Sequence, residues 1–357
     1  MTKFGQWKPN RGMGAILMAK WYLDEGFQSD VVLSTRVRLA RNIEGLPFPN
    51  RMSDADGKKL ISMVEQALSR LNYQFRLVRM EEIDDLERQK LMEEHFISPD
   101  MLKNTKNKAV FISADDSVSI LVGEEDHLRL QSMFSGLEAQ KAYDLLDKVD
   151  AFLAKELPYA YHEKYGFLTA CPTNVGTGMR LSFMMHLPAL CKTHMADSLF
   201  STIGKLGITV RGLYGEGTKS QGDVFQVSNQ VTLGRSETEI MDGVTEVVNQ
   251  IIAKERELRS RMMQENGAAI EDKVFRALGT LRYARILPSA ELNSLLSHVR
   301  MGVSIGLIPD VSIRDLNTVM VMSRPGHVMD DRTLTSFERD VRRAALVRQR
   351  LHGEKEA

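Results

Sequence analysis

Residues 168–188, which read LTACPTNVGTGMRLSFMMHLP, form the stretch that decides the fold. A short apolar run ends at Cys171, and a turn of small polar residues and glycines follows it. Residues 179–187 then have the composition of a buried strand, so the order predicts a strand, a tight turn and a second strand. The turn would bring the thiol close to the guanidinium of Arg180. The alternative interpretation is a cysteine that packs as a small apolar side chain.

The composition predicts about two domains in a reducing cytoplasm. The chain has 357 residues, long enough to bury a sizeable core. Its 47 basic and 47 acidic residues balance, which gives no argument for nucleic acid or an anionic membrane as partner. Two cysteines exclude a disulfide scaffold and suit a cytoplasmic protein. We expect no transmembrane helix, because no apolar run reaches about 18 residues, and we expect no signal peptide.

Residues 31–42 predict a strand that carries two arginines on one face. Arg36 and Arg38 alternate with Val37 and Leu39, and side chains two apart on a strand project to the same side. Two guanidinium groups on one face repel each other unless an anion lies between them. A solvated edge strand is the alternative interpretation.

A second polar run follows a predicted hairpin of residues 109–113 and 117–122. Residues 123–129 read GEEDHLR, with three adjacent carboxylates that would ordinarily form a solvated turn. We expect residues 128–157 to continue as a helix, with Gly136 as the likeliest interruption. Further helices are expected at residues 14–24, 54–72, 81–96, 190–206, 238–263, 270–300 with a break near 287–288, and 310–350; further strands are expected at 208–214 and 223–233.

Three of these stretches together resemble the phosphagen (guanidino) kinase family. Residues 171–180 match the signature C-P-[ST]-N-x-G-T-G-x-R at every fixed position. Residues 34–38 resemble the family's S-[ST]-R-[VI]-R, and residues 123–129 resemble its [NG]-E-E-D-H-L-R. The resemblance implies an α+β fold, with a mostly antiparallel sheet flanked by helices, like the catalytic domain of phosphagen kinases and glutamine synthetase. An α-helical domain would follow it.

The resemblance also implies ATP as the bound nucleotide, with Mg²⁺ carried by the ATP and not by protein side chains. Arginine suits phosphate because its planar fork donates in pairs to the oxygens. His95 resembles a family position that packs on the adenine ring, although a lone histidine at a helix end more often interacts with the helix dipole. The implied ATP-binding residues are Ser34, Thr35, Arg36, Val37, Arg38, His95, Arg129, Arg180, Leu181, Ser182, Phe183, Met184, Arg211 and Gly212.

Three residues take catalytic roles by the same resemblance. Glu125 and Glu216 would clamp a substrate guanidinium, which has a pKa above 12 and is a poor nucleophile until it is polarised and loses a proton. Cys171 would hold a guanidinium nitrogen electrostatically, as a thiolate favoured by the surrounding cations. After Arg211 the family's commoner Arg-Gly-Thr is replaced by Arg-Gly-Leu-Tyr, a departure that concerns substrate choice more than nucleotide binding.

The order of domains resembles one branch of the family, the McsB-like bacterial protein arginine kinases. A lead-in of residues 1–26, a catalytic domain of residues 27–258 and a C-terminal helical domain of residues 259–357 are expected. The helical domain is expected to mediate oligomerisation. It contains the R-D-x-x-R-A pattern by which this branch binds phosphoarginine, and here Arg339, Asp340, Arg343 and Ala344 would form that pocket. The alternative is an ion pair within one helix.

The function that follows is ATP-dependent phosphorylation of arginine side chains in proteins, which marks them for degradation under stress. One alternative is a kinase for a small guanidino metabolite, and another is a non-catalytic nucleotide-binding adaptor. A homodimer or larger homo-oligomer is expected. By resemblance, the other partners are a zinc-finger activator protein, a Clp-type ATPase or protease and a heat-shock transcription repressor.

Overall fold

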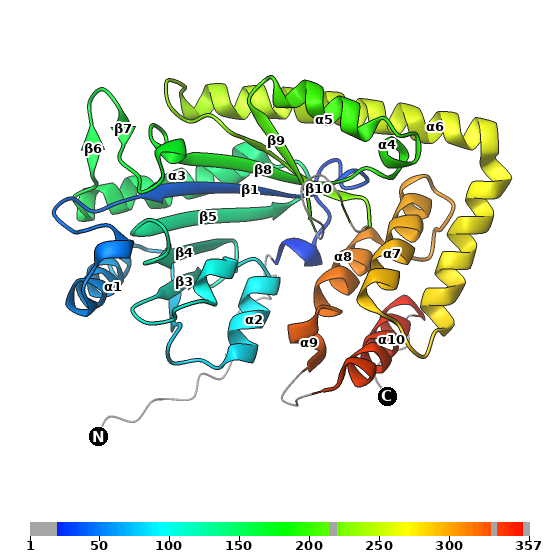
Figure 1. Cartoon of the computed structure of the whole chain (residues 1–357), viewed down its shortest axis with the longest axis horizontal. Coiled ribbons are helices and arrows are strands. Elements are labelled where there is room, and N and C mark those ends of the chain that lie inside the picture. The colour runs from blue at the N-terminus through cyan, green and yellow to red at the C-terminus, as the bar shows by residue number, and fades with distance from the viewer. Residues whose placement is uncertain (1–19, 214–219, 221, 330–333, 353–357) are drawn as a thin grey trace.

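An eight-stranded sheet forms the body of the molecule, and a group of helices packs against one end of it (Figure 1). The computed structural model describes residues 20–213, 220, 222–329 and 334–352. The sheet order is β2-β3-β4-β5-β1-β8-β10-β9, and every pairing between these strands is antiparallel. The strands are β1 (Val32–Arg41), β2 (Phe75–Arg79), β3 (Ala109–Ser113), β4 (Val118–Val122), β5 (Leu128–Ser135), β8 (Met179–His186), β9 (Ile208–Gly212) and β10 (Val224–Asn229). The predicted fold class is confirmed.

Ten α-helices are described, the last four of them in the helical group. They are α1 (Asp54–Leu68), α2 (Asp85–Glu93), α3 (Ala139–Glu156), α4 (Pro188–Lys192), α5 (Ala196–Gly204), α6 (Glu237–Tyr283), α7 (Ser289–Ser304), α8 (Ile313–Met322), α9 (Pro325–Met329) and α10 (Ser336–His352). A small hairpin of β6 (Tyr161–His162) and β7 (Gly166–Phe167) stands apart from the main sheet. No described helix is apolar and long enough to cross a membrane.

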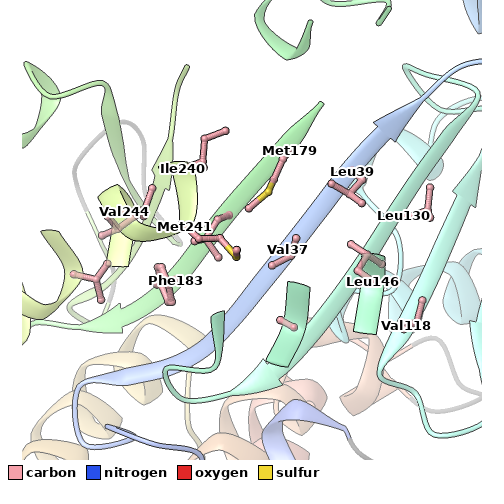
Figure 2. Packing of buried hydrophobic residues seen from close by; sticks show 14 of the residues in the cluster. Val37, Leu39, Val118, Leu130, Leu146, Met179, Phe183, Ile240, Met241 and Val244 are labelled. Carbon is pink, nitrogen blue, oxygen red and sulfur yellow. The ribbon is translucent and has the colours of Figure 1, made fainter. Parts of the chain in front are cut away.

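The main hydrophobic core lies between the sheet and helices α1, α3, α5 and α6. Val37 and Leu39 of β1 are buried in it, as the alternation on this strand predicts. Figure 2 shows these two side chains with Leu146 from α3 and Val244 from α6. Because one face of β1 is fixed in this core, Arg36 and Arg38 are held on the opposite face. Since β1 lies between β5 and β8, the solvated edge strand is the wrong interpretation.

Helix α6 joins this core to a second one. Its first part packs on the sheet up to Leu258, and its last part, from Ile270, packs in the helical group. Asn266 between them has non-helical backbone angles, which kink the helix (Figure 1). We therefore propose a domain boundary at this kink, a few residues after the predicted position 259. The helical group, α7 to α10 with the end of α6, is called the helical domain below.

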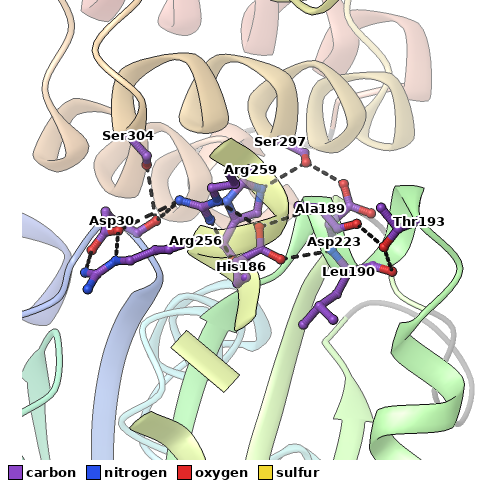
Figure 3. A network of polar contacts seen from close by, with 11 residues as sticks. Asp30, His186, Ala189, Leu190, Thr193, Asp223, Arg256, Arg259, Ser297 and Ser304 are labelled. Atoms are coloured by element: carbon purple, nitrogen blue, oxygen red, sulfur yellow. Dashed lines mark hydrogen bonds and ion pairs between the residues drawn. The ribbon is translucent and has the colours of Figure 1, made fainter. Parts of the chain in front are cut away.

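A buried polar network fixes the first part of α6 to the ends of β8 and β10. Glu255 is fully buried, and its two oxygens accept from the backbone N–H groups of Ala189 and Leu190 at the start of α4, both at 3.0 Å. Arg259 donates to Glu255 at 2.7 Å and to the backbone oxygen of His186 at 3.1 Å. Figure 3 shows Arg259, His186, Ala189 and Leu190 of this network. The buried charges of Glu255 and Arg259 therefore both have partners.

Two sequence predictions of secondary structure are wrong because non-local pairing decides the outcome. Residues 128–135 form β5 and not the start of a helix, since this segment pairs with β1 on one side and β4 on the other. Only after Gly136 does α3 begin. Residues 168–171 form no strand, and the strand that precedes the turn is the two-residue β7, which ends at Phe167.

Other predictions need smaller corrections. The helix expected at residues 190–206 is divided into α4 and α5, with His194 between them at a φ of 57°. The helix expected at residues 81–96 shortens to α2. The helix expected at residues 14–24 lies mostly outside the described residues, and only a 3-10 turn at Trp21–Leu23 is described there. The hairpin of β3 and β4, and the break between α6 and α7, are confirmed.

One buried ion pair fixes the end of β1 and makes a testable prediction. Arg41 donates to Asp150 of α3, with 2.7 Å between Nη2 and Oδ2, and its guanidinium carbon lies 3.5 Å from the centre of the Phe167 ring. Its Nη1 donates to the backbone oxygen of Thr177 at 2.8 Å. Asp150→Ala should lower the free energy of unfolding by about 3–5 kcal/mol, because Arg41 is left buried without its counter-charge. Urea unfolding measures this loss.

The matched control removes both charges. Arg41→Met combined with Asp150→Leu should recover most of the stability, since no charge is then left unpaired. Equal stability of wild type and Asp150→Ala would show that the pair contributes nothing.

Candidate functional site

The exposed side of strands β1, β5, β8 and β9 gathers the predicted arginines around one cavity. This cavity of about 640 Å³ is called the arginine cavity. Strand register explains the gathering, because Arg38 lies opposite Arg180 on β8, and Ala40 lies opposite Arg129 on β5. The predicted site residues that line it are Arg36, Arg38, Glu125, Arg129, Cys171, Arg180, Arg211 and Gly212.

The guanidinium groups repel one another at this site. Burial, followed by repulsion from Arg129 and Arg180, lowers the pKa of Arg36 to about 10. Burial and the same neighbours, together with Arg36, lower the pKa of Arg38 well below its ordinary value. The pKa of Arg180 is lowered as well, by burial and by repulsion from Arg211 and Arg129. Such a cluster favours a ligand with several negative charges.

The two adjacent carboxylates of Glu124 and Glu125 both pair with Arg129, but only one of them is buried. Glu124 is buried and forms an ion pair with Arg129 at 2.5 Å, and it also accepts a hydrogen bond from Ser98. Glu125 is exposed to the cavity and lies 3.1 Å from Arg129. Partial burial raises the pKa of Glu125, which makes its carboxylate a better proton acceptor. Glu124 therefore positions an arginine, whereas Glu125 is available to a second ligand.

The loop that carries Cys171 is held by a buried network that sequence reasoning missed. Asp126 accepts from the backbone N–H of Ala170 at 2.7 Å and from Asn42 at 2.7 Å. Asn42 in turn donates to the backbone oxygen of Leu168 at 3.0 Å. Cys171 is half-buried, and its sulfur lies 3.0 Å from the hydroxyl oxygen of Thr173. The third acidic residue of the GEEDHLR run is thus a structural support for the thiol loop.

The last glycine of the signature turn, Gly178, is required at its position for steric reasons. Gly178 has a φ of +64°, a region that residues with a Cβ rarely adopt. A Cβ at this position would come within 2.6 Å of the backbone oxygen of Ala40. The turn therefore packs directly on β1, which brings Cys171 and Arg180 to the same cavity as Arg38.

Two polar residues of β10 support β8 from the other side. Arg180 donates to the hydroxyl of Ser228 at 3.1 Å. Asn229 accepts from the backbone N–H of Leu181 at 2.8 Å and donates to the backbone oxygen of Met179 at 3.0 Å. This Ser-Asn pair lies in the strand expected at residues 223–233, which resembles the family's F-x-[IV]-S-N pattern, but sequence reasoning gave the pair no role. Its hydrogen bonds to the neighbouring strand explain why both residues are polar although buried.

His95 lies in a neighbouring cavity of about 570 Å³ that also borders Arg36 and Arg38, and it is called the interdomain cavity. The φ of His95 is +69°, and its backbone oxygen accepts from Gln131 at 2.5 Å. Burial, followed by repulsion from three arginines, lowers its pKa well below the ordinary value, so the ring is neutral at pH 7. A left-handed residue held in place by its surroundings is typical of a functional position.

Several predicted nucleotide-binding residues are not brought to either cavity. Val37, Leu181 and Phe183 point into the core on the opposite face of the sheet. Thr35 donates to the backbone oxygen of Gly136 at 2.6 Å. The side chains of Ser34, Ser182 and Met184 are buried on the cavity side of the sheet but do not line the cavities. No side-chain contact supports these seven assignments, and they stay predictions. Glu216 lies outside the described residues.

The R-D-x-x-R-A motif lies at the start of α10. Arg343 is buried and donates to the backbone oxygens of Ser323 and Leu287, both at 2.9 Å, and it pairs with Asp340 at 2.5 Å. Ala344 is buried in the core of the helical domain. Arg339 and Asp340 are partly exposed. Although the motif is remote in sequence, Arg343 also borders the interdomain cavity.

Comparison with known proteins decides the family. Residues 58–258, more than half of the chain, match the family described as ATP:guanido phosphotransferase, C-terminal catalytic domain. The chain belongs to this family. Residues 267–357 match the protein-arginine kinase McsB C-terminal domain, so the resemblance drawn from the motifs is confirmed. The second match begins directly after the kink at Asn266.

Relatives in the family extend the match over nearly the whole chain. The chain is 45% identical over 336 residues to the protein-arginine kinase of Pelotomaculum thermopropionicum, which covers 92% of this chain and 94% of that protein. It is 45% identical over 340 residues to that of Symbiobacterium thermophilum, with 93% and 96% covered. Among solved structures, the duplicated taurocyamine kinase from Schistosoma mansoni with bound transition state analog components has a TM-score of 0.59 at 30% identity, covering 66% of this chain and 34% of that one. Lombricine kinase has a TM-score of 0.59 at 24% identity, with 71% and 74% covered, and shows the shared fold.

The support of the thiol loop gives a prediction that is independent of catalysis. Asp126→Ala should speed the alkylation of Cys171 by iodoacetamide several-fold, because the N–H of Ala170 loses its acceptor and the loop loosens. The free energy of unfolding should fall by about 1–3 kcal/mol for the unsatisfied donors. Cys191 provides the internal control, since it lies outside this network and its alkylation rate should not change. Unchanged reactivity of Cys171 would contradict the role given to Asp126.

Proposed function

We propose that this chain is an ATP-dependent protein arginine kinase that transfers the γ-phosphate of ATP to arginine side chains of proteins. The observation that carries the proposal is the arginine cavity, in which five guanidinium groups, two carboxylates and a thiol meet. The guanidinium groups suit the triphosphate, and the carboxylates and thiol suit a cationic acceptor. The relatives named protein-arginine kinase support the same acceptor.

The arginines would bind the phosphates, and the carboxylates and the thiol would bind the acceptor. Arg36, Arg38, Arg129, Arg180 and Arg211 would hold the phosphates and stabilise the charge of the transition state. Glu125, together with Glu216, would clamp the acceptor guanidinium in line with the γ-phosphorus. A guanidinium nitrogen then forms the new bond to phosphorus while the bond to the bridging oxygen of ADP breaks, and the released proton goes to the carboxylate. Cys171, as a thiolate, would hold a second nitrogen of the acceptor.

Mg²⁺ would enter with the phosphates of ATP. It would neutralise part of their charge. Among the described residues, Asp100 and Glu125 line the arginine cavity with carboxylates, and oxygen is the ligand that Mg²⁺ prefers. The ion would still be carried by ATP, as the resemblance implies, with these two side chains beside it and not as its ligands.

The biological setting is a further part of the proposal. Both cysteines are free thiols, which fits a reducing cytoplasm. We propose that the products are proteins marked for degradation under stress and that the chain works as a homo-oligomer. The zinc-finger activator, the Clp-type ATPase or protease and the heat-shock repressor remain proposed partners. The partly exposed Arg339 and Asp340 beside Arg343 support a phosphoarginine pocket, which titration of free phosphoarginine against wild type and Asp340→Ala tests.

The deciding experiment supplies ATP, Mg²⁺ and an unfolded protein, and then measures acid-labile phosphate on arginine. Wild type should form phosphoarginine. Acid treatment identifies this product, because a P–N bond hydrolyses in acid whereas phosphoserine largely survives. Glu125→Gln should slow single-turnover transfer about a hundredfold or more, because it removes a proton acceptor, while the affinity for ATP stays near that of wild type. Glu124→Gln is the matched comparison, and it should weaken ATP binding because Arg129 loses its buried partner.

Three other outcomes count against this assignment. Transfer to free arginine but not to protein would favour the small-metabolite kinase. ATP binding with no transfer to either acceptor would favour the non-catalytic adaptor. Near-normal transfer by Glu125→Gln would remove this residue from the mechanism.

A further inference from the structure

The interdomain cavity has walls from both parts of the chain. Its sheet side includes Arg36, Arg38 and His95, and its opposite side is formed by residues of α7, α8 and the segment before α9. Arg36, Arg38, Pro99, Leu213 and Gln226 border this cavity and the arginine cavity alike. A ligand whose phosphates lie among the arginines would therefore extend its other end between the sheet and the helical domain.

The lining of this cavity suits a flat heterocycle. Met92 and Ile97 on the sheet side face Leu292 and Met320 of the helical domain with apolar surface. Asn293 of α7 adds an amide, which can donate and accept at the edge of a base. The apolar surfaces and the amide of Asn293 are therefore the groups that a base would contact.

A buried contact sets the spacing between the two walls. Glu93, at the end of α2, is 2% exposed, and its oxygens accept from the backbone N–H groups of Gly326 at 2.9 Å and His327 at 3.3 Å in the helical domain. Arg324 donates to the backbone oxygen of Glu93 at 2.9 Å. A Cβ at Gly326 would come within 2.8 Å of the carboxylate of Glu93, so the contact leaves no room for a larger residue. The segment that carries His95 is thus fixed to the helical domain.

We propose that the helical domain supplies one wall of the site for the base of the nucleotide, with Asn293 as its polar contact and Leu292 and Met320 as its apolar surface. The inference rests on the proposed function, because it assumes that the phosphates occupy the arginine cavity. It assigns the helical domain a direct part in nucleotide affinity. The ligand class is a nucleoside polyphosphate, held by both domains at once.

The test separates the base from the phosphates. Titration calorimetry with Mg²⁺ compares ADP with tripolyphosphate, which offers phosphates without a base. Asn293→Trp fills the cavity from the helical side and should raise the dissociation constant for ADP about tenfold or more, while that for tripolyphosphate stays unchanged. Ser294→Trp is the matched control, since this neighbouring position is exposed and does not line the cavity, and it should bind both ligands as wild type does.

A second variant guards against misfolding. Asn293→Ala adds no bulk, and it should weaken ADP binding several-fold with no change for tripolyphosphate. Wild-type affinity of Asn293→Trp for ADP would overturn the inference, and so would an equal loss for both ligands, which would place the effect in the arginine cavity. If wild type itself binds neither ligand, the proposed function fails, and that result is distinct from a failure of the helical wall alone.

Discussion

Mutual repulsion between guanidinium groups on the central strands is the constraint on which the rest of the structure depends. Arg36 and Arg38 share one face of β1, and strand register sets Arg180 directly opposite Arg38. Burial lowers the pKa of both β1 arginines, so the charged forms are held at a cost in stability. The apolar side chains on the other face of β1, packed against α3 and α6, hold the strand in place against this repulsion. The fold thereby holds these arginines together as a binding site for a polyanion, at a cost in stability.

The sequence motifs predicted which residues would meet but not how they are held. The alternation of arginine with Val37 and Leu39 was enough to predict a strand with a charged face. Nothing local shows that β1 is central, because that depends on pairing with β5 and β8. The same pairing makes β5 a strand, although residues 128–135 had been expected to be helical. Likewise, Asp126 read as one of three acidic residues in a turn, whereas its neighbours in space are Asn42 and the thiol loop.

The helical domain is fixed beside the face of the sheet that carries Arg36 and Arg38. Helix α6 continues from one hydrophobic core into the other across the kink at Asn266, so the two domains share an element. Glu255 and Glu93 are two buried carboxylates that accept hydrogen bonds from backbone N–H groups of another element. Glu255 lies within the first part of α6, and Glu93 lies beside His95. Because the contact between Glu93 and the backbone of Gly326 and His327 is buried and specific, the position of the helical domain is coupled to the cavities below it.

The most direct measurement of the central claim is the melting temperature of wild type and Arg38→Met, each with and without ATP and Mg²⁺. The account predicts that Arg38→Met melts at a higher temperature than wild type without nucleotide, because a buried cation that its neighbours repel has been replaced by a neutral side chain of similar length. It also predicts that ATP raises the melting temperature of wild type much more than that of the variant, since binding to the folded state stabilises it. A variant that melts lower than wild type without nucleotide, and gains as much from ATP, would contradict the account.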